Sequence, residues 1–185
     1  MNETLKSIAE RYSCRAYESR SVEKEKLDAI ALAAVQAPSA MNRQPWEIVV
    51  ITNKELIEEM DAAAMDELAA REDKSFYNRM MERGGKIFYN APCMFVVIKK
   101  PLNNHATLDC GIATQNIALA AHSLGLANVI CAMANLPLTG PRGDEFKAKI
   151  GIEGDGEFGM AVLVGYAQQP GQPHEADLSK IRYIY

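Results

Sequence analysis

The most apolar stretch of the chain, residues 111–129, limits most narrowly what the chain can fold into. It is interrupted by three polar side chains: Gln115, Asn116 and His122. A membrane-spanning helix of about 20 residues tolerates such side chains poorly. We therefore interpret the stretch as part of a buried helix of a globular domain, which covers residues 106–124 and ends at Gly125. The length of 185 residues suits a single domain over 1–185 with a full hydrophobic core.

Hydrophobic spacing in the rest of the chain predicts alternating helices and strands. Runs rich in β-branched residues predict strands at 46–51, 93–99, 128–133 and 159–166. Helical spacing predicts helices at 3–9, 23–37, 53–70 and 144–150. The highly charged stretch 71–83 lacks a clean period, and we expect it to be helical but exposed. We expect Ser21 and Thr52 to cap the second and third of these helices. The connections are irregular, so an α+β fold fits better than a doubly wound sheet.

The charge balance and the cysteines argue against several kinds of site. The chain has 20 basic and 24 acidic residues, a net charge of −4, and no long basic run, which argues against nucleic acid as a partner. The cysteines form no Cys-x-x-Cys pair and the histidines show no metal-ligand spacing, so we expect no metal site and no redox dithiol. The residues concerned are Cys14, Cys93, Cys110, Cys131, His105, His122 and His174.

The first residues lack the apolar run of a secretory leader. We therefore expect a cytoplasmic protein without a membrane anchor, in which the cysteines are reduced and act as small buried apolar residues. Two disulfides are the alternative, but a chain of this length does not need them to be stable.

A first candidate site is the cluster Arg11-x-Ser13-x-Arg15. In an extended segment, residues two apart point to the same side. Two guanidinium groups and a hydroxyl would then converge, a set that suits a phosphate. The alternative is a solvated charged turn that follows the first helix.

A second candidate is the loop 37–46, in which Pro38 and Pro45 bracket Ser39, Asn42 and Gln44. Side-chain amides match a ring edge that presents both donors and acceptors, as the pyrimidine part of a flavin does. The alternative is a connecting loop whose polar residues cap the neighbouring backbone.

These two motifs resemble those of the FMN-dependent nitroreductase family. The matching letters are Arg-x-Ser-x-Arg-x-Tyr from Arg11 and Ala-Pro-Ser-x-x-Asn-x-Gln-Pro-Trp from Ala37. Three more motifs follow in the family's order: Tyr-Asn-Ala-Pro at 89–92, Asp-x-Gly-Ile-Ala-x-Gln-Asn at 109–116 with Leu-Gly-Leu at 124–126, and Val-Gly-Tyr at 164–166. The resemblance covers nearly the whole chain and is weakest over 60–86.

The resemblance implies a nitroreductase-like fold, in which helices flank a central mixed or antiparallel sheet, and an intertwined homodimer that binds FMN between its subunits. One subunit would hold the phosphate and ribityl end, and the loop of the other would approach the flavin ring. By motif, the first set is Arg11, Ser13 and Arg15, and the second is Pro38, Ser39, Asn42 and Gln44.

Two further parts of the site follow from the same resemblance. A backbone N–H of Ala132 or Met133 would bond flavin nitrogen 5, although some members have Glu-Gly or Gly-Gly where this chain reads Cys131-Ala132-Met133. Lys180 and Arg182 resemble the family's late basic pair, which would add charge at the phosphate; the alternative is a surface tail.

The implied activity is a two-step electron transfer from NADH or NADPH, through FMN, to a small electron-poor acceptor of the nitroaromatic or quinone type. The flavin carries the chemistry, so no catalytic side chain is predicted. The alternatives are an FMN-binding storage or sensor module with little turnover, a different flavin reaction on the same fold, and a dimer that has lost its cofactor.

Two remaining stretches have weaker interpretations. The charged residues 60–86 suit a substrate lid or, equally, a solvated helical face. The glycines at 151, 154 and 156 precede a strand and do not open a helix, so the stretch lacks the dinucleotide-binding fingerprint and predicts a turn.

Overall fold

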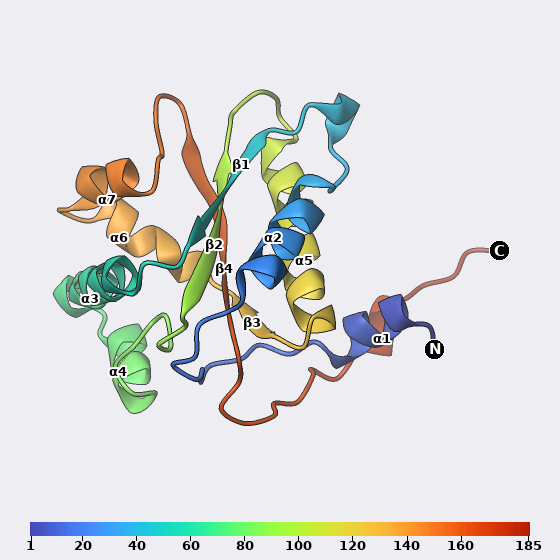
Figure 1. Cartoon of the computed structure of the whole chain (residues 1–185), viewed down its shortest axis with the longest axis horizontal. Helices are drawn as coiled ribbons and strands as arrows, with labels where there is room; N and C mark the ends of the chain where they lie inside the picture. Colours follow the sequence, from blue (N-terminus) through green and yellow to red (C-terminus); the bar gives the residue numbers. More distant parts are fainter.

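A four-stranded antiparallel sheet with helices on both faces forms the centre of the protein (Figure 1). The structure is a computed structural model that describes residues 1–185. The sheet order is β1-β2-β4-β3, and every pair of neighbouring strands is antiparallel. The strands are β1 (Trp46–Ile51), β2 (Cys93–Lys99), β3 (Ala127–Ile130) and β4 (Glu157–Gly165). The predicted α+β class is thus confirmed, and β1 leaves one edge of the sheet unpaired.

Strand β2 shows why both faces of the sheet are covered. Six of its seven residues are buried, which requires packing on both sides because successive side chains point to opposite faces. Phe95 and Val97 pack into the core under α2 and α5. Met94 and Val96 pack into the core under α3, α4 and α7.

The helices divide between these two faces. Helices α2 and α5 cover one face, and α3, α4, α6 and α7 lie on the other (Figure 1). The α-helices are α1 (Glu3–Glu10), α2 (Lys24–Val35), α3 (Lys54–Ala70), α4 (Ser75–Glu82), α5 (Ala106–Ser123), α6 (Leu136–Thr139) and α7 (Gly143–Lys149). Three short 3₁₀ helices are η1 (Ala40–Asn42), η2 (Ala132–Asn135) and η3 (Leu178–Lys180). None of the helices is both long and apolar enough to cross a membrane.

The predicted helix ends are partly right. Helix α5 ends where expected, and Gly125 follows with a φ of 75°, a conformation that glycine adopts without steric cost. The predicted caps are wrong. Asn53 caps α3, since its side chain accepts the backbone N–H of Leu56 at 3.1 Å, and Thr52 does not. Helix α2 begins after Glu23 without a side-chain cap, so Ser21 plays no such part.

The predicted strand 128–133 is too long. The last bond to β4 runs from the backbone N–H of Cys131 to the carbonyl of Ala161, at 2.8 Å. At Ala132 the chain turns into η2, which leads directly into α6. Alanine and methionine favour a helix over a strand, and Pro137 lies in the first turn of α6, where its missing N–H costs nothing.

The charged stretch 71–83 is helical only in part. Helix α3 ends at Ala70, and α4 begins at Ser75 after a short turn. The stretch 151–156 forms the predicted turn, with positive φ at Gly151 and Gly154, directly before β4.

Candidate functional site

The segment Arg11–Arg15 runs in extended form beside the start of β3. Ser13 forms a parallel bridge with Asn128, and the backbone N–H of Cys14 donates to the Asn128 carbonyl at 2.9 Å. Cys14 is buried, whereas Ser13 and Arg15 are exposed and Arg11 is half-buried. Arg15 Nη1 donates to the Ser13 carbonyl at 3.4 Å, and neither arginine forms an ion pair. Guanidinium donors and a hydroxyl are therefore free on one side of the segment.

The loop between α2 and β1 is held in shape by its own polar groups. The backbone N–H of Gln44 donates to Ser39 Oγ at 2.8 Å, and Gln44 Nε2 donates to Asn42 Oδ1 at 3.0 Å. Met41, Asn42 and Gln44 have φ of 55°, 53° and 47°, a region that non-glycine residues seldom adopt. Strain of this kind persists only where the surroundings hold it, and it is concentrated at functional sites.

The internal bonds of the loop decide which polar atoms face outward. Because Asn42 Oδ1 accepts from Gln44, the Asn42 amide keeps its N–H donors free, and the Gln44 amide keeps its oxygen free. The Ser39 hydroxyl accepts within the loop and can still donate outward. All three residues are at least partly exposed. The loop therefore offers both donors and an acceptor in a fixed arrangement.

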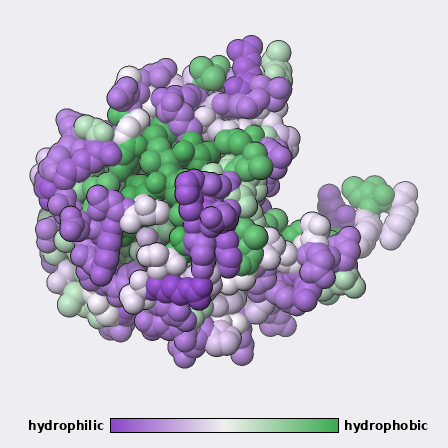
Figure 2. Space-filling view, in the orientation of Figure 1, coloured by the Kyte–Doolittle hydropathy of each residue, from purple (hydrophilic) through white to green (hydrophobic).

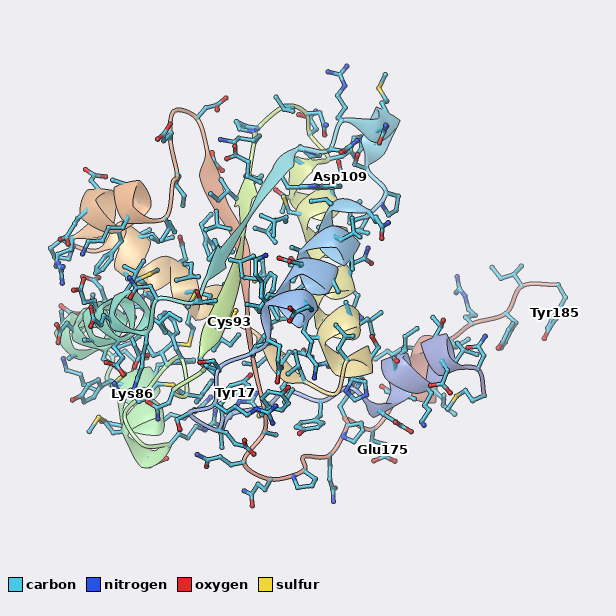
Figure 3. The ribbon with its side chains drawn as sticks, in the orientation of Figure 1. Tyr17, Lys86, Cys93, Asp109, Glu175 and Tyr185 are labelled. Atoms are coloured by element: carbon cyan, nitrogen blue, oxygen red, sulfur yellow. The ribbon has the colours of Figure 1, made fainter.

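Asp109 holds this loop in place, a role that the sequence reasoning missed. The residue is only 3% exposed, and its carboxylate accepts the backbone N–H of Ala40, at 3.2 Å to Oδ1 and 3.3 Å to Oδ2. Figure 3 shows Asp109 in the first turn of α5, beside the loop. One feature of the sequence indicates that Asp109 is important: it is an acidic residue at the start of a long apolar helix, where the helix dipole favours a negative charge.

The loop and the arginine segment lie at opposite ends of the sheet in one chain. Trp46, which follows the loop, pairs with Lys99 at the end of β2. Asn128, which pairs with Ser13, is opposite Val164, and Val164 is opposite Cys93 at the start of β2. Six strand residues separate the two ends, or about 20 Å. Figure 1 shows the loop at the top and the segment after α1 at the bottom.

Ala132 and Met133 line a hollow between η2 and the junction of α3 and α4. Its volume is about 300 Å³. The other side is formed by Leu68 and Arg71 from the end of α3 and by Phe76 from α4. The structure thus brings the residues predicted to contact a flavin together with part of the predicted lid.

The late basic pair lies on an exposed tail. Residues 168–185 are exposed throughout, and Lys180 is 3.8 Å from Asp177, an ion pair within the tail. No hydrogen bond or ion pair links Lys180 or Arg182 to the Arg11–Arg15 segment. Within one chain, the only ion pair of these two residues is the one between Lys180 and Asp177.

The four cysteines are unpaired and buried. Burial raises the pKa of Cys93 to about 12 and those of Cys110 and Cys131 to about 11. These thiols stay protonated at neutral pH, which makes them poor nucleophiles. Their interpretation as small buried apolar residues is confirmed.

A sequence profile of the nitroreductase family matches residues 8–166, which include the arginine segment, the strained loop, Asp109 and η2. This chain belongs to the nitroreductase family. The resemblance seen in its motifs is thereby confirmed.

Solved nitroreductase structures share the whole fold of this nitroreductase-family protein. A nitroreductase with bound FMN from Desulfitobacterium hafniense DCB-2 is 51% identical, with a TM-score of 0.97 and full coverage of both chains. A nitroreductase with bound FMN from Bacteroides fragilis is 26% identical, with a TM-score of 0.88 and full coverage of both chains. An Archaeoglobus fulgidus protein provisionally named NADH dehydrogenase/NAD(P)H nitroreductase is 31% identical over 96% of this chain and 92% of its own.

Proposed function

We propose that the protein carries electrons from NADH or NADPH, by way of FMN, to a small electron-poor acceptor of the nitroaromatic or quinone type. As a member of the nitroreductase family it is an FMN-dependent oxidoreductase. The observation that carries the proposal is the preformed loop 38–44, whose outward donors and acceptor complement the edge of a flavin ring.

The arginine segment fits the phosphate end of FMN. A phosphate monoester carries a charge of about −1.5 to −2 at neutral pH. Arg11 and Arg15 have no carboxylate partners, and Ser13 adds a neutral donor on the same side. Charge-assisted bonds of this kind are the strong ones in proteins. These three residues would hold the phosphate and orient the ribityl chain.

The loop fits the opposite end of FMN. The pyrimidine edge of a flavin alternates carbonyl oxygens with an N–H group. The free N–H donors of Asn42 and the Ser39 hydroxyl suit the carbonyl oxygens, and the free oxygen of Gln44 suits the N–H. Pro38 stiffens the approach to this loop by fixing its own φ.

We infer a homodimer from the distance between these two halves. One chain places them at opposite ends of β2, about 20 Å apart, so we propose that each FMN uses the arginine segment of one subunit and the loop of the other. The exposed tail suits such a dimer, and in the second subunit Lys180 and Arg182 would add charge near the phosphate.

The outer surface of the chain also suits a subunit interface. Figure 2 shows apolar surface gathered over β1 and α2. Leu32 and Val35 of α2 are 57% and 43% exposed, and Ile184 of the tail is 83% exposed. Large apolar patches of this kind mark interaction surfaces.

FMN supplies the electron transfer itself, because its ring accepts a hydride from a nicotinamide and passes two electrons on. The chain supplies position. The N–H of Ala132, the first of η2, has no partner within that helix and is available to a ring nitrogen, whereas the N–H of Met133 is directed at the Cys131 sulfur. For a nitroaromatic acceptor, NAD(P)H and one proton convert the nitro group to a nitroso group and release water and NAD(P)⁺.

The turn at 71–74 and helix α4 form the candidate lid, because Arg71 and Phe76 face Ala132 and Met133 across the hollow. The exposed remainder of α4 is the solvated face that the charge pattern also predicted. A lid in this place would exclude water from the flavin and select the acceptor by shape.

We also propose a reducing, cytoplasmic compartment, because all four cysteines are unpaired.

An absorbance spectrum of the purified protein, followed by anaerobic addition of NADH and then NADPH, tests the proposal. We expect flavin peaks that bleach rapidly with at least one donor and recover when a nitroaromatic or a quinone is added. Flavin that stays oxidised with both donors would favour a binding or storage module. Absence of flavin, even after incubation with FMN, would contradict the cofactor assignment.

A further inference from the structure

The residues that line the hollow beside η2 limit the class of acceptor that can bind there. Its walls are mainly apolar and come from Leu68, Phe76, Met133 and Leu136. Leu68 is fully buried, whereas Phe76 is 38% exposed and borders the opening. A volume of about 300 Å³ is at the lower end of the range for small-molecule pockets. It suits a substituted aromatic ring.

One cation borders this apolar space. Arg71 is the first residue after α3, and its side chain lines the hollow. It forms no ion pair, although Glu72 and Asp73 follow it directly. Asp73 is engaged elsewhere, since its carboxylate accepts the backbone N–H of Ser75 at 2.8 Å. The guanidinium of Arg71 is therefore free to bind a ligand.

A second arginine, Arg79, lies beside Phe76 on α4 but does not line the hollow. The guanidinium carbon of Arg79 lies 5.7 Å from the centre of the Phe76 ring, and Arg79 also forms no ion pair. The nearby Lys74 does not compete for a ligand, because its ammonium donates to the carbonyl of Ala69 at the end of α3. An aromatic ring in the hollow would thus have apolar walls and a guanidinium at one side.

We propose that the acceptor is a flat aromatic molecule that carries a carboxylate, and that Arg71 binds this carboxylate. The inference rests on the proposed function and names its substrate class. Arginine suits the task because its planar fork matches a carboxylate with two parallel bonds. The amide of Asn135, at the end of η2, also lines the hollow and offers a further donor.

The nicotinamide donor is a poorer partner for Arg71. The 2′-phosphate of NADPH belongs to the adenosine half of the molecule, far from the ring that delivers the hydride. The hollow adjoins Ala132 and Met133, where the reactive edge of the flavin is proposed to lie. A group that reaches Arg71 therefore belongs to a molecule whose ring is itself in the hollow.

The test compares 4-nitrobenzoate with its neutral analogue 4-nitrobenzamide. We expect the FMN-loaded protein to prefer the benzoate. Arg71→Gln should lower kcat/KM for the benzoate by about 10-fold, since the pair is partly exposed, and leave the benzamide unchanged. For the benzoate, the kcat/KM of Arg71→Lys should fall between that of the wild type and that of Arg71→Gln. Arg83→Gln, at the end of α4 and outside the hollow, is the matched control and should change neither.

A binding measurement makes the outcome independent of turnover. Calorimetry with benzoate and benzamide should show a preference for benzoate that Arg71→Gln removes. If the wild-type protein binds benzoate selectively but transfers electrons from NADH or NADPH to neither a nitro compound nor a quinone, the proposed function fails while the carboxylate site stands. Equal losses for both compounds, no loss for either, or a change confined to NADPH would each overturn the assignment of Arg71.

Discussion

The carboxylate of Asp109 and the backbone N–H of Ala40 form a partly buried bond that joins the first turn of α5 to the strained loop before β1. Both carboxylate oxygens lie within 3.3 Å of this nitrogen. The bond links parts of the chain 69 residues apart. It fixes the start of η1 and therefore the direction in which the Asn42 and Gln44 amides face.

We expect Asp109→Ala to weaken FMN binding. The variant leaves the N–H of Ala40 without its acceptor, which should lower the free energy of unfolding by about 1–3 kcal/mol and release the loop. The dissociation constant for FMN, measured by fluorescence titration, should rise about 10-fold, while Asp109→Asn, which keeps an acceptor oxygen, should lose less. Asp155→Ala, at an exposed position, is the control. Unchanged FMN affinity in Asp109→Ala would show that the loop does not depend on this bond.

The arginine segment should distinguish FMN from riboflavin, which lacks the phosphate. Arg11→Ala and Arg15→Ala each remove a candidate phosphate partner, and we expect the affinity for FMN to fall about 10-fold or more. The affinity for riboflavin should hardly change. Equilibrium dialysis with both flavins checks this, with Arg83→Ala as the control. Equal losses for the two flavins would contradict a phosphate role.

Removal of residues 177–185 should shift the protein toward the monomer. The tail is exposed in the single chain, with Leu178 72% and Tyr183 72% exposed. Its loss therefore leaves the chain's own core intact. Sedimentation velocity should show a higher dissociation constant for the dimer, and circular dichroism should show unchanged helix content. A truncated protein that dimerises as tightly as the full chain would exclude the tail from the interface.

The free energy of unfolding should depend on pH through the buried carboxylate of Asp61 on α3. Its carboxylate accepts the backbone N–H of Phe88 at 2.7 Å and lies 3.5 Å from Lys86. Burial raises its pKa above the ordinary value of 3.8 despite these partners. The folded state then holds this proton more tightly than the unfolded state. The contribution of Asp61 to stability is therefore greatest below pH 3.8 and is lost as the pH rises through the folded pKa.

Asp61→Asn removes this titration and keeps an acceptor for Phe88. We expect the free energy of unfolding of the variant, relative to the wild type, to increase between pH 4 and pH 7. Urea unfolding at several pH values measures it, with Asp155→Asn as the exposed baseline. If the relative free energy of unfolding falls over the same range, the pKa of Asp61 is lowered in the folded state, and the prediction is wrong.

The exact ends of β1 and β2 could be predicted, because a residue next to each strand in the sequence marks where it begins. Pro45 precedes β1 and Pro92 precedes β2, and both strands are rich in β-branched residues. The end of β3 could not be found in this way, because Ile130-Cys131-Ala132-Met133 is apolar in either conformation. Strand β4 continues past Ala161 to Glu157, but the chain leaves it after the bond from Cys131 to Ala161 and turns into η2. A single sequence does not show which of the two conformations the packing favours at this point.

The local parts of the site follow from the order of residues along the chain. A spacing of two places Ser13 and Arg15 on one side of an extended segment, since successive side chains in extended backbone alternate. The way these parts combine depends on contacts between distant parts of the chain: Asp109 bonds to Ala40, Arg71 lies across a hollow from Met133, and β2 separates the loop from the arginine segment. Periodicity follows from the backbone geometry of neighbouring residues, whereas contacts between residues far apart in the chain depend on the packing of the whole fold around its sheet.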